Sequence, residues 1–186
     1  MASRTVTRSA DTERDTGKPV TAAYLERAAV FYLERYASSS ENLRRVLLRK
    51  ARRRSGAQPD EDTAKLIDET VDKAIRSGLV DDAAYAGARL GTLLRRGASV
   101  SRAKAALAAK GIAGGTIEAA LGEAEPDDFA QARRYAERRR LGPFRRLADP
   151  ARRDRDLAAL VRAGFSYRAA TAALAPRTDE ETEPSG

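Results

Sequence analysis

The segment Leu160-Val161-Arg162-Ala163-Gly164-Phe165 is the clearest indication of the fold of this 186-residue chain, because the same pattern occurs three times. It joins the apolar end of a helix, a glycine, and a large apolar residue that leads into a new helix. The other copies are residues 107–112 and 75–79. Self-similarity at a period of about 50 residues is typical of an array of small units, each burying its apolar face partly against the next. Such arrays usually offer a binding surface and seldom build a catalytic pocket.

Two further pairs of similar segments show that the repeat extends beyond this glycine-containing pattern. Residues 81–86 (DDAAYA) return as residues 127–130 (DDFA), and residues 118–121 (EAAL) return as residues 171–174 (TAAL). The same helical unit is therefore expected to recur along the chain.

The composition favours helices over strands. Hydrophobic residues make up 42% of the chain, but aromatic residues only 5%, and tryptophan is absent. The apolar content is mostly alanine and leucine, which suits helices that pack closely through small side chains. No stretch alternates between apolar and polar residues with a period of two, so we expect no strands. The predicted fold is all-α.

The apolar pattern predicts three helical repeats between two tails. Residues 1–20 and 175–186 are poor in apolar side chains, and we expect both to be disordered. Three-helix repeats are expected at residues 21–80, 81–125 and 126–174, stacked end to end into an elongated array. A unit with a short turn between its second and third helices is similar to helix-turn-helix modules, although core and turn residues alone could produce that outline.

Capping residues predict where the helices begin. Residues 38–41 form a capping-box pattern, in which Ser38 accepts a hydrogen bond from an amide one turn on and Glu41 reaches back. Ser99 and Ser166 are expected to cap later helices. The pairs at residues 81–82 and 127–128 could be imagined as Mg²⁺ ligands, but each precedes a helical stripe, so helix-start carboxylates are the favoured interpretation.

The helical stripes also predict which large side chains face the core. They are Leu25, Tyr32, Leu33, Tyr36, Leu43, Val46, Leu47, Leu66, Ile67, Val71, Ile75, Leu79, Tyr85, Leu90, Leu93, Leu94, Val100, Leu107, Ile117, Leu121, Phe129, Leu157, Leu160, Val161 and Leu174. Among these, Leu47, Leu107 and Leu160 align as equivalent positions of the second helices.

The residue types that are missing limit the chemistry. The chain has no cysteine, which excludes disulfides, thiolate metal sites and cysteine nucleophiles. It has no histidine, the commonest general base and metal ligand. Its glycines form neither a phosphate loop nor a dinucleotide fingerprint. We therefore expect no enzyme, no metal site and no cofactor.

The sequence also shows no recognisable signal for export and no segment expected to cross a membrane. No signal-peptide pattern opens it, and no apolar run approaches about 18 residues. We expect a soluble cytoplasmic protein.

Positive charge is concentrated on the helical body. The net charge is +8, from 35 Lys and Arg against 27 Asp and Glu. Residues 1–20 hold +1 and residues 175–186 hold −3, which leaves +10 on the body between them. A basic body attracts polyanions and acidic protein surfaces through a field that salt weakens.

Three basic clusters are the candidate binding residues, one in each predicted repeat. They are Arg44, Arg45, Arg49 and Lys50; Arg95, Arg96, Arg102, Lys104 and Lys110; and Arg133, Arg134, Arg138 and Arg139. Arginine forks bind phosphate or carboxylate through two parallel hydrogen bonds and keep their charge. Contact with nucleic acid and contact with an acidic partner explain the clusters equally well, and a solvated helix face is the third interpretation.

Four segments resemble a known family. Residues 32–47 resemble the opening repeat of the bacterial recombination regulator RecX. Residues 78–86 resemble that family's signature of glycine, two apolar residues, Asp-Asp and an aromatic-alanine pair. Residues 107–112 and 163–166 match its later lysine-glycine-apolar and glycine-phenylalanine-serine phrases. The similarity runs from about residue 24 to residue 174.

The resemblance implies a function that the residues alone leave open. It implies tandem three-helix repeats in an elongated, curved body that works as a monomer without catalysis. RecX proteins bind the RecA recombinase filament and inhibit its growth, ATP hydrolysis, strand exchange and promotion of repressor cleavage, and some also bind DNA. The alternative is a stand-alone DNA-binding protein built from helix-turn-helix-like units.

The chain departs from the family pattern at three places. Residues 52–63 form a long connection, Tyr85 stands where phenylalanine is usual, and Ala163 replaces a lysine or arginine before Gly164. None of these departures changes the expected fold.

Overall fold

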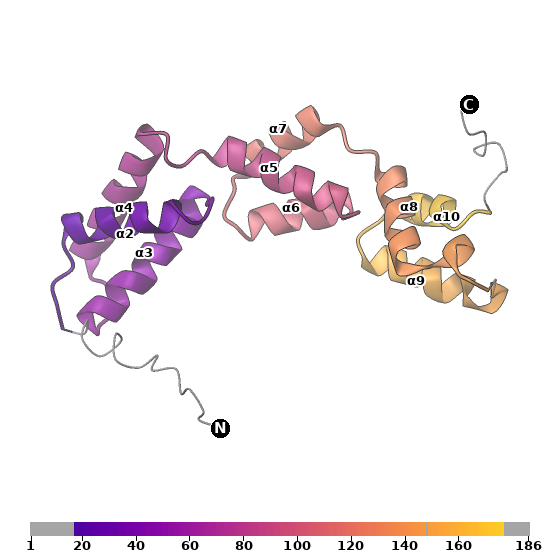
Figure 1. Cartoon of the computed structure of the whole chain (residues 1–186), viewed down its shortest axis with the longest axis horizontal. Coiled ribbons are helices and arrows are strands. Elements are labelled where there is room, and N and C mark those ends of the chain that lie inside the picture. The colour runs from indigo at the N-terminus through magenta and orange to yellow at the C-terminus, as the bar shows by residue number, and fades with distance from the viewer. Residues whose placement is uncertain (1–16, 148, 177–186) are drawn as a thin grey trace, which may run out of the picture. The chain divides into compact units, whose positions relative to one another are not determined.

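The computed structural model describes residues 17–147 and 149–176, and within them the chain forms helices and turns without a strand (Figure 1). This confirms the all-α prediction for that part of the chain. The two predicted disordered tails lie largely outside the described residues. The α-helices are α2 (Ala22–Leu33), α3 (Ser40–Ser55), α4 (Glu61–Arg76), α5 (Asp82–Arg95), α6 (Val100–Ala108), α7 (Gly114–Ala124), α8 (Asp128–Arg139), α9 (Arg153–Arg162) and α10 (Tyr167–Ala173). Two short 3₁₀ helices, η1 (Gly142–Phe144) and η2 (Pro150–Arg152), precede α9.

The chain divides into two compact units. Unit 1 comprises Met1–Tyr85 with Lys110–Ile112, and unit 2 comprises Ala86–Ala109 with Ala113–Gly186. Each unit is described by itself below. The boundaries of the three repeats stay a prediction.

Unit 1 is built around the packing of α2, α3 and α4. Leu25, Leu43 and Leu47 are fully buried and Ile67 is nearly so, as their helical spacing predicts. The side chain of Thr21 caps α2, and the Asp60 carboxylate caps α4 by accepting a hydrogen bond from the Thr63 amide at 2.8 Å.

The cap of α3 corrects the predicted capping box. Ser39, and not Ser38, is the capping residue, and its hydroxyl accepts a hydrogen bond from the Asn42 amide at 3.2 Å. Ser38 instead accepts one from the side-chain amide of Asn42 at 2.8 Å. Glu41 turns outward to pair with Arg45 one turn further along the helix. The prediction was wrong by one residue because either serine can occupy a cap, and local sequence does not choose between them.

The core of unit 2 consists of leucine side chains that pack closely against small side chains. Leu90, Leu107 and Leu160 are fully buried, and Phe165 is 3% exposed. Ser99 and Ser166 cap α6 and α10 as predicted.

The two Asp-Asp pairs lie at helix starts, as predicted. Asp81 accepts hydrogen bonds from the backbone amides of residues 83 and 84, and Asp127 accepts one from that of residue 129, each at 2.9 Å. Asp82 has a different role, because it accepts two hydrogen bonds from Ser40, at 2.8 Å from the amide and 2.6 Å from the hydroxyl.

Five large apolar side chains that were expected inside are exposed instead. They are Tyr36, Ile75, Leu79, Phe129 and Val161. Tyr36 and Leu79 lie beyond the ends of their helices, where the helical stripe no longer applies. The other three are on the flanks of stripes whose centres are buried, because each helix here packs on only a few neighbours and covers less than its whole apolar face.

No helix in the described ranges combines the length and the apolar character that crossing a membrane requires.

Candidate functional site

A buried serine fixes how the helices of unit 2 meet. The Ser99 side chain is 1% exposed, and its hydroxyl accepts a hydrogen bond from the Arg102 amide at the start of α6. The same hydroxyl donates a hydrogen bond to the Ala163 carbonyl at 2.8 Å, at the end of α9. Gly164 follows with a φ of 90°, and a Cβ atom there would lie 2.7 Å from the Ser99 hydroxyl. One serine therefore caps α6 and holds it against the end of α9.

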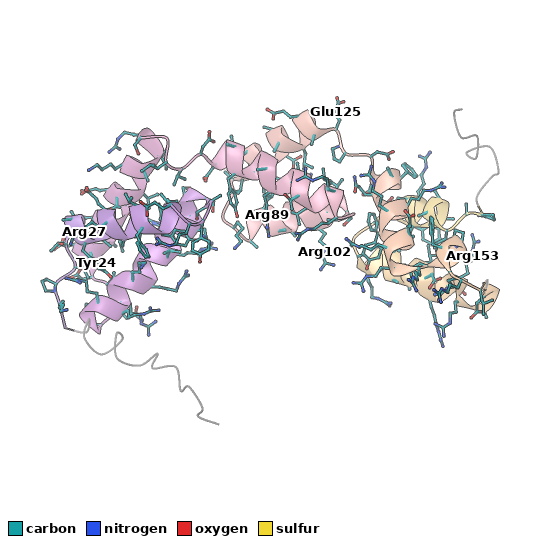
Figure 2. All side chains as sticks on the ribbon, in the orientation of Figure 1. Tyr24, Arg27, Arg89, Arg102, Glu125 and Arg153 are labelled. Carbon is teal, nitrogen blue, oxygen red and sulfur yellow. The ribbon has the colours of Figure 1, made fainter. Side chains whose placement is uncertain are left out.

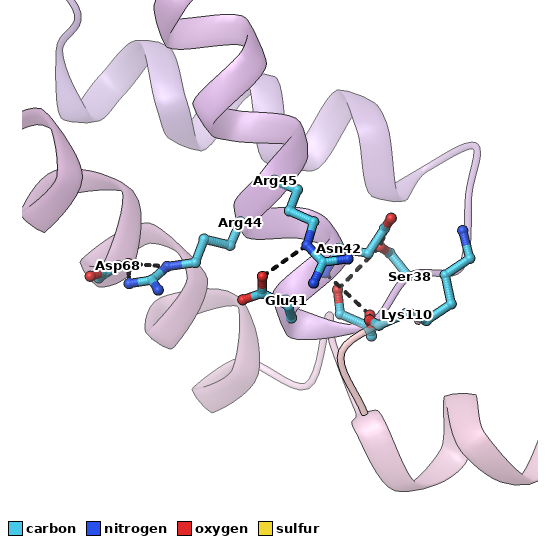
Figure 3. Close-up of polar contacts among 8 residues, drawn as sticks. Ser38, Glu41, Asn42, Arg44, Arg45, Asp68 and Lys110 are labelled. Atoms are coloured by element: carbon cyan, nitrogen blue, oxygen red, sulfur yellow. Dashed lines mark hydrogen bonds and ion pairs between the residues drawn. The ribbon is translucent and has the colours of Figure 1, made fainter. Parts of the chain in front are cut away.

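Unit 1 contains a contact of the same design (Figure 3). The Ser39 hydroxyl donates to the Lys110 carbonyl at 2.5 Å while it caps α3. Gly111 has a φ of 78°, and a Cβ atom there would lie 2.2 Å from Cγ of Glu41. We call each of these serine–carbonyl–glycine contacts a serine joint. The serine stands eight residues before Leu47 or Leu107, and the glycine four residues after Leu107 or Leu160.

The joint of unit 2 brings together arginines that are far apart in the sequence. Two adjoining hollows, of about 430 and 200 Å³, are lined by arginines from α5–α6 and from α8–α9. Those arginines are Arg96, Arg102, Arg138, Arg139 and Arg162, and Tyr135 lines both hollows. We call this surface the arginine groove; Figure 2 labels Arg102, which α6 contributes to it.

The arginine groove has no acidic counter-charge of its own. None of its lining residues is Asp or Glu. Throughout the described part of the chain, none of the five arginines forms an ion pair with a carboxylate. Their positive charge is therefore available to a ligand.

Tyr135 gives the groove a half-buried floor. Its ring meets the Phe165 ring edge-on with centroids 5.5 Å apart. The guanidinium carbons of Arg138 and Arg139 lie 6.0 and 5.8 Å from its ring centre, within the range of a cation–π interaction. Packed between Phe165 and two cations, this ring supports guanidinium groups that can grip a phosphate or carboxylate.

The first predicted cluster is partly neutralised within unit 1. Arg44 donates from Nε to Asp68 at 2.6 Å, and this hydrogen bond raises the pKa of the guanidinium (Figure 3). Arg45 pairs with Glu41 at 2.9 Å. Arg49 is exposed and Lys50 is half-buried on the same helix.

The remaining predicted residues lie outside the arginine groove. Arg95 donates to the Thr92 hydroxyl at 3.3 Å, and Lys104 pairs with Glu118 at 2.8 Å. Lys110 supplies its carbonyl to the joint of unit 1. Arg133 and Arg134 are exposed on α8. Of the thirteen predicted residues, the structure gathers Arg96, Arg102, Arg138 and Arg139 into one surface.

Comparison with known proteins gives the family. Residues 81–121 match the sequence model of a family domain described as "RecX, second three-helix domain". Over 166 residues the chain is 38% identical to the regulatory protein RecX of Myxococcus xanthus (strain DK1622), covering 83% of this chain and 87% of that protein. The chain belongs to the RecX family. It is also 29% identical over 159 residues to the regulatory protein RecX of Agrobacterium fabrum (strain C58 / ATCC 33970), covering 85% of each.

Solved RecX structures share the fold. A crystal structure of RecX from Lactobacillus salivarius superposes with a TM-score of 0.63 at 21% identity, covering 82% of this chain and 94% of that one. A second crystal structure, of a regulatory protein RecX, gives a TM-score of 0.60 at 19% identity, covering 80% of this chain and 68% of that one. Both likenesses support the helical RecX fold of this chain.

Two members of the arginine groove were not predicted from the sequence. Arg162 is the only charged residue in the segment 160–165, so it belongs to no basic run. Tyr135 lies inside the third cluster, and an aromatic ring among four nearby arginines was the signal that could have identified it.

Proposed function

We propose that this RecX-family chain binds the RecA recombinase filament and modulates its assembly, ATP hydrolysis, strand exchange and promotion of repressor cleavage. The observation that carries the proposal is the 38% identity to a regulatory RecX protein across 87% of that protein's length. Relatives that are named regulatory proteins also favour a chain without catalysis of its own. In this proposal the protein acts in the cytoplasm, as a monomer built from repeats at residues 21–80, 81–125 and 126–174.

The proposed contacts are electrostatic. The arginine groove is the leading contact, because its guanidinium groups have no carboxylate partner in the described part of the chain. The other basic residues predicted from the sequence add weaker contacts to acidic side chains or to DNA phosphates on the filament. Several modest contacts on one chain combine through effective concentration into a useful affinity.

The test is the DNA-dependent ATP hydrolysis of the cognate RecA, measured while this protein is added from substoichiometric to equimolar amounts. Wild type is expected to inhibit. The variant R102E/R139E is expected to need at least about tenfold more protein, because reversing charges in a binding surface costs more than about 1.4 kcal/mol. The matched control is R27E/R76E, which makes the same change in net charge at two exposed residues of α2 and α4.

Two results would contradict the proposal. If wild type leaves ATP hydrolysis unchanged up to equimolar amounts, this chain does not modulate RecA. If R27E/R76E loses as much inhibition as R102E/R139E, net charge alone explains the effect, and the arginine groove is not the contact.

A stand-alone DNA-binding protein is the second candidate, favoured by the combination of guanidinium groups with the Tyr135 ring. It predicts binding to a single-stranded oligonucleotide in the absence of RecA. Its affinity would fall with salt at a logarithmic slope of about −0.7 for each phosphate neutralised, so five arginines give a slope near −3.5. Oligonucleotide binding together with a lack of any effect on RecA would favour this second function.

A further inference from the structure

The segment 60–82 of this basic chain is acidic. It contains eight Asp and Glu against three Lys and Arg, a net charge of −5, whereas the whole chain carries +8. Most of the segment forms α4, which packs on α2 and α3 within unit 1. Acidic surface attracts basic groups and repels polyanions. The chemistry of its partner is therefore opposite to that of the partner of the arginine groove.

The acidic side of α4 borders a hollow within unit 1. The hollow has a volume of about 390 Å³ and lies between the start of α3 and the second half of α4. Carboxylates of Glu41, Asp68 and Asp72 line it. Arg44 lines it as well, and Figure 3 shows this arginine reaching from α3 towards Asp68 on α4. We call this surface the acidic hollow.

The acidic hollow already holds one guanidinium group. Arg44 donates from Nε to the Asp68 carboxylate at 2.6 Å, and this hydrogen bond is the main cause of the raised pKa of Arg44. The negative charges of Glu41 and Asp72 raise that pKa further. Asp72 itself forms no ion pair in the part of the chain that the structure describes. Its charge is therefore available to a cation from another molecule.

An exposed apolar side chain lies beside the Asp72 carboxylate. Ile75 follows Asp72 by three residues on α4, which makes them neighbours on the helix surface, and its side chain is 45% exposed. Val71 lines the same hollow. Arginine and lysine lay their methylene stems along apolar surface while their charged ends stay in a polar environment. The acidic hollow thus offers an apolar wall for such a stem and a carboxylate for its charged end.

We propose that the acidic hollow binds a basic amphipathic segment of a partner protein, in the manner of a helix in a groove. An arginine of that segment lies along Val71 and Ile75 and pairs with Asp72. An apolar side chain one helical turn away covers the rest of the exposed surface of Ile75. Arginine fits better than lysine, because a carboxylate accepts two parallel hydrogen bonds from a guanidinium group. The proposal concerns unit 1 alone and holds whether or not the arginine groove contacts RecA.

Fluorescence anisotropy tests the site with the full-length chain and a labelled synthetic peptide. In this peptide arginine and leucine recur one helical turn apart among alanines, so that they share one helix face. Wild type is expected to bind it saturably. D72K is expected to bind at least about tenfold more weakly, because it replaces an attraction by a repulsion. The matched control is E69K, which makes the same change in charge at an exposed residue of α4 outside the hollow and should lose less than about threefold.

Two altered peptides test the two halves of the site. One has glutamine in place of arginine, and the other has serine in place of leucine. Each is expected to bind at least about fivefold more weakly, through the lost charged hydrogen bonds or the lost apolar contact. The proposal is wrong if either altered peptide binds as tightly as the original. It is also wrong if D72K and E69K lose equally, because the peptide is then attracted by acidic charge alone.

Backbone amide signals in NMR spectra locate the bound peptide. On titration with unlabelled peptide, the signals of Asp68, Asp72 and Ile75 are expected to shift, while those of Gly97 and Ala163 at the arginine groove stay in place. Shifts that spare the acidic hollow would overturn the proposal. Sedimentation of wild type alone is expected to show no self-association; self-association that D72K abolishes would replace the partner protein by a second copy of this chain. RecA is absent from these experiments, so their failure is distinct from failure of the proposed function.

Discussion

Gly164 at the joint of unit 2 offers the sharpest test of how the start of α6 is held against the end of α9. Its φ of 90° lies in the left-handed region, so an alanine there costs about 1–2 kcal/mol of backbone strain. The added Cβ would also lie 2.7 Å from the Ser99 hydroxyl, and overpacking of this kind costs about 1–3 kcal/mol. We expect G164A to lower the free energy of unfolding by about 3 kcal/mol. Gly78 is the matched control: its φ is 72° and nothing lies within 4 Å of its added Cβ, so G78A should show the backbone strain alone.

A double-mutant cycle isolates the contact with the serine hydroxyl. S99A removes the helix cap, which costs about 1 kcal/mol, and leaves the Ala163 carbonyl without its donor, which costs about 1–3 kcal/mol. It also removes the atom that the new Cβ of G164A would meet. In the S99A background, G164A should therefore cost only the backbone strain. The double variant should be more stable than the sum of the single variants predicts, by about 1–3 kcal/mol.

Urea unfolding followed by far-ultraviolet circular dichroism measures these free energies, since the chain lacks tryptophan for fluorescence. Equal m-values across the four proteins would show that the variants change stability and leave the extent of unfolding unaltered. If the two single changes add within about 0.5 kcal/mol, the Ser99 hydroxyl is not the neighbour that requires glycine at position 164. If G78A costs as much as G164A, backbone strain explains the whole effect and the joint does not depend on close packing.

Two further predictions concern carboxylates. Asp156 is 4% exposed and holds Arg145 and the Gly142 amide, so D156N should cost about 3 kcal/mol in urea unfolding. D149N, which loses only an exposed pair, should cost less than about 1 kcal/mol, and equal losses would contradict this. The hydrogen bond that the Asp60 carboxylate accepts from the Thr63 amide lowers the pKa of Asp60. The ionised cap therefore stabilises the fold in full above the ordinary carboxyl pKa, and this stabilisation is lost as the pH falls through the lowered pKa. The stability gap between wild type and D60N should therefore narrow below about pH 4 in acid titrations, and a gap that widened there would refute the sign.

Local signals were sufficient to predict most of the helices. The caps at Ser99 and Ser166 were predicted correctly because an N-cap hydrogen bond depends on the next three residues only. The choice between Ser38 and Ser39 was wrong because Ser39 also donates to a carbonyl 71 residues away. A local pattern contains no information about that second partner.

The sequence predicted which residues could form the candidate site, but it did not predict which of them lie together in the fold. The sequence separated Arg96 and Arg102 from Arg138 and Arg139, since it groups charges by their neighbours along the chain. The structure regroups them because the serine joint sets α6 against α9, and α8 packs on α9 and on the last helix. Arg44 and Lys104 looked equally free in the sequence, but each faces a carboxylate on the next helix. Only a folded chain distinguishes a paired arginine from an unpaired one.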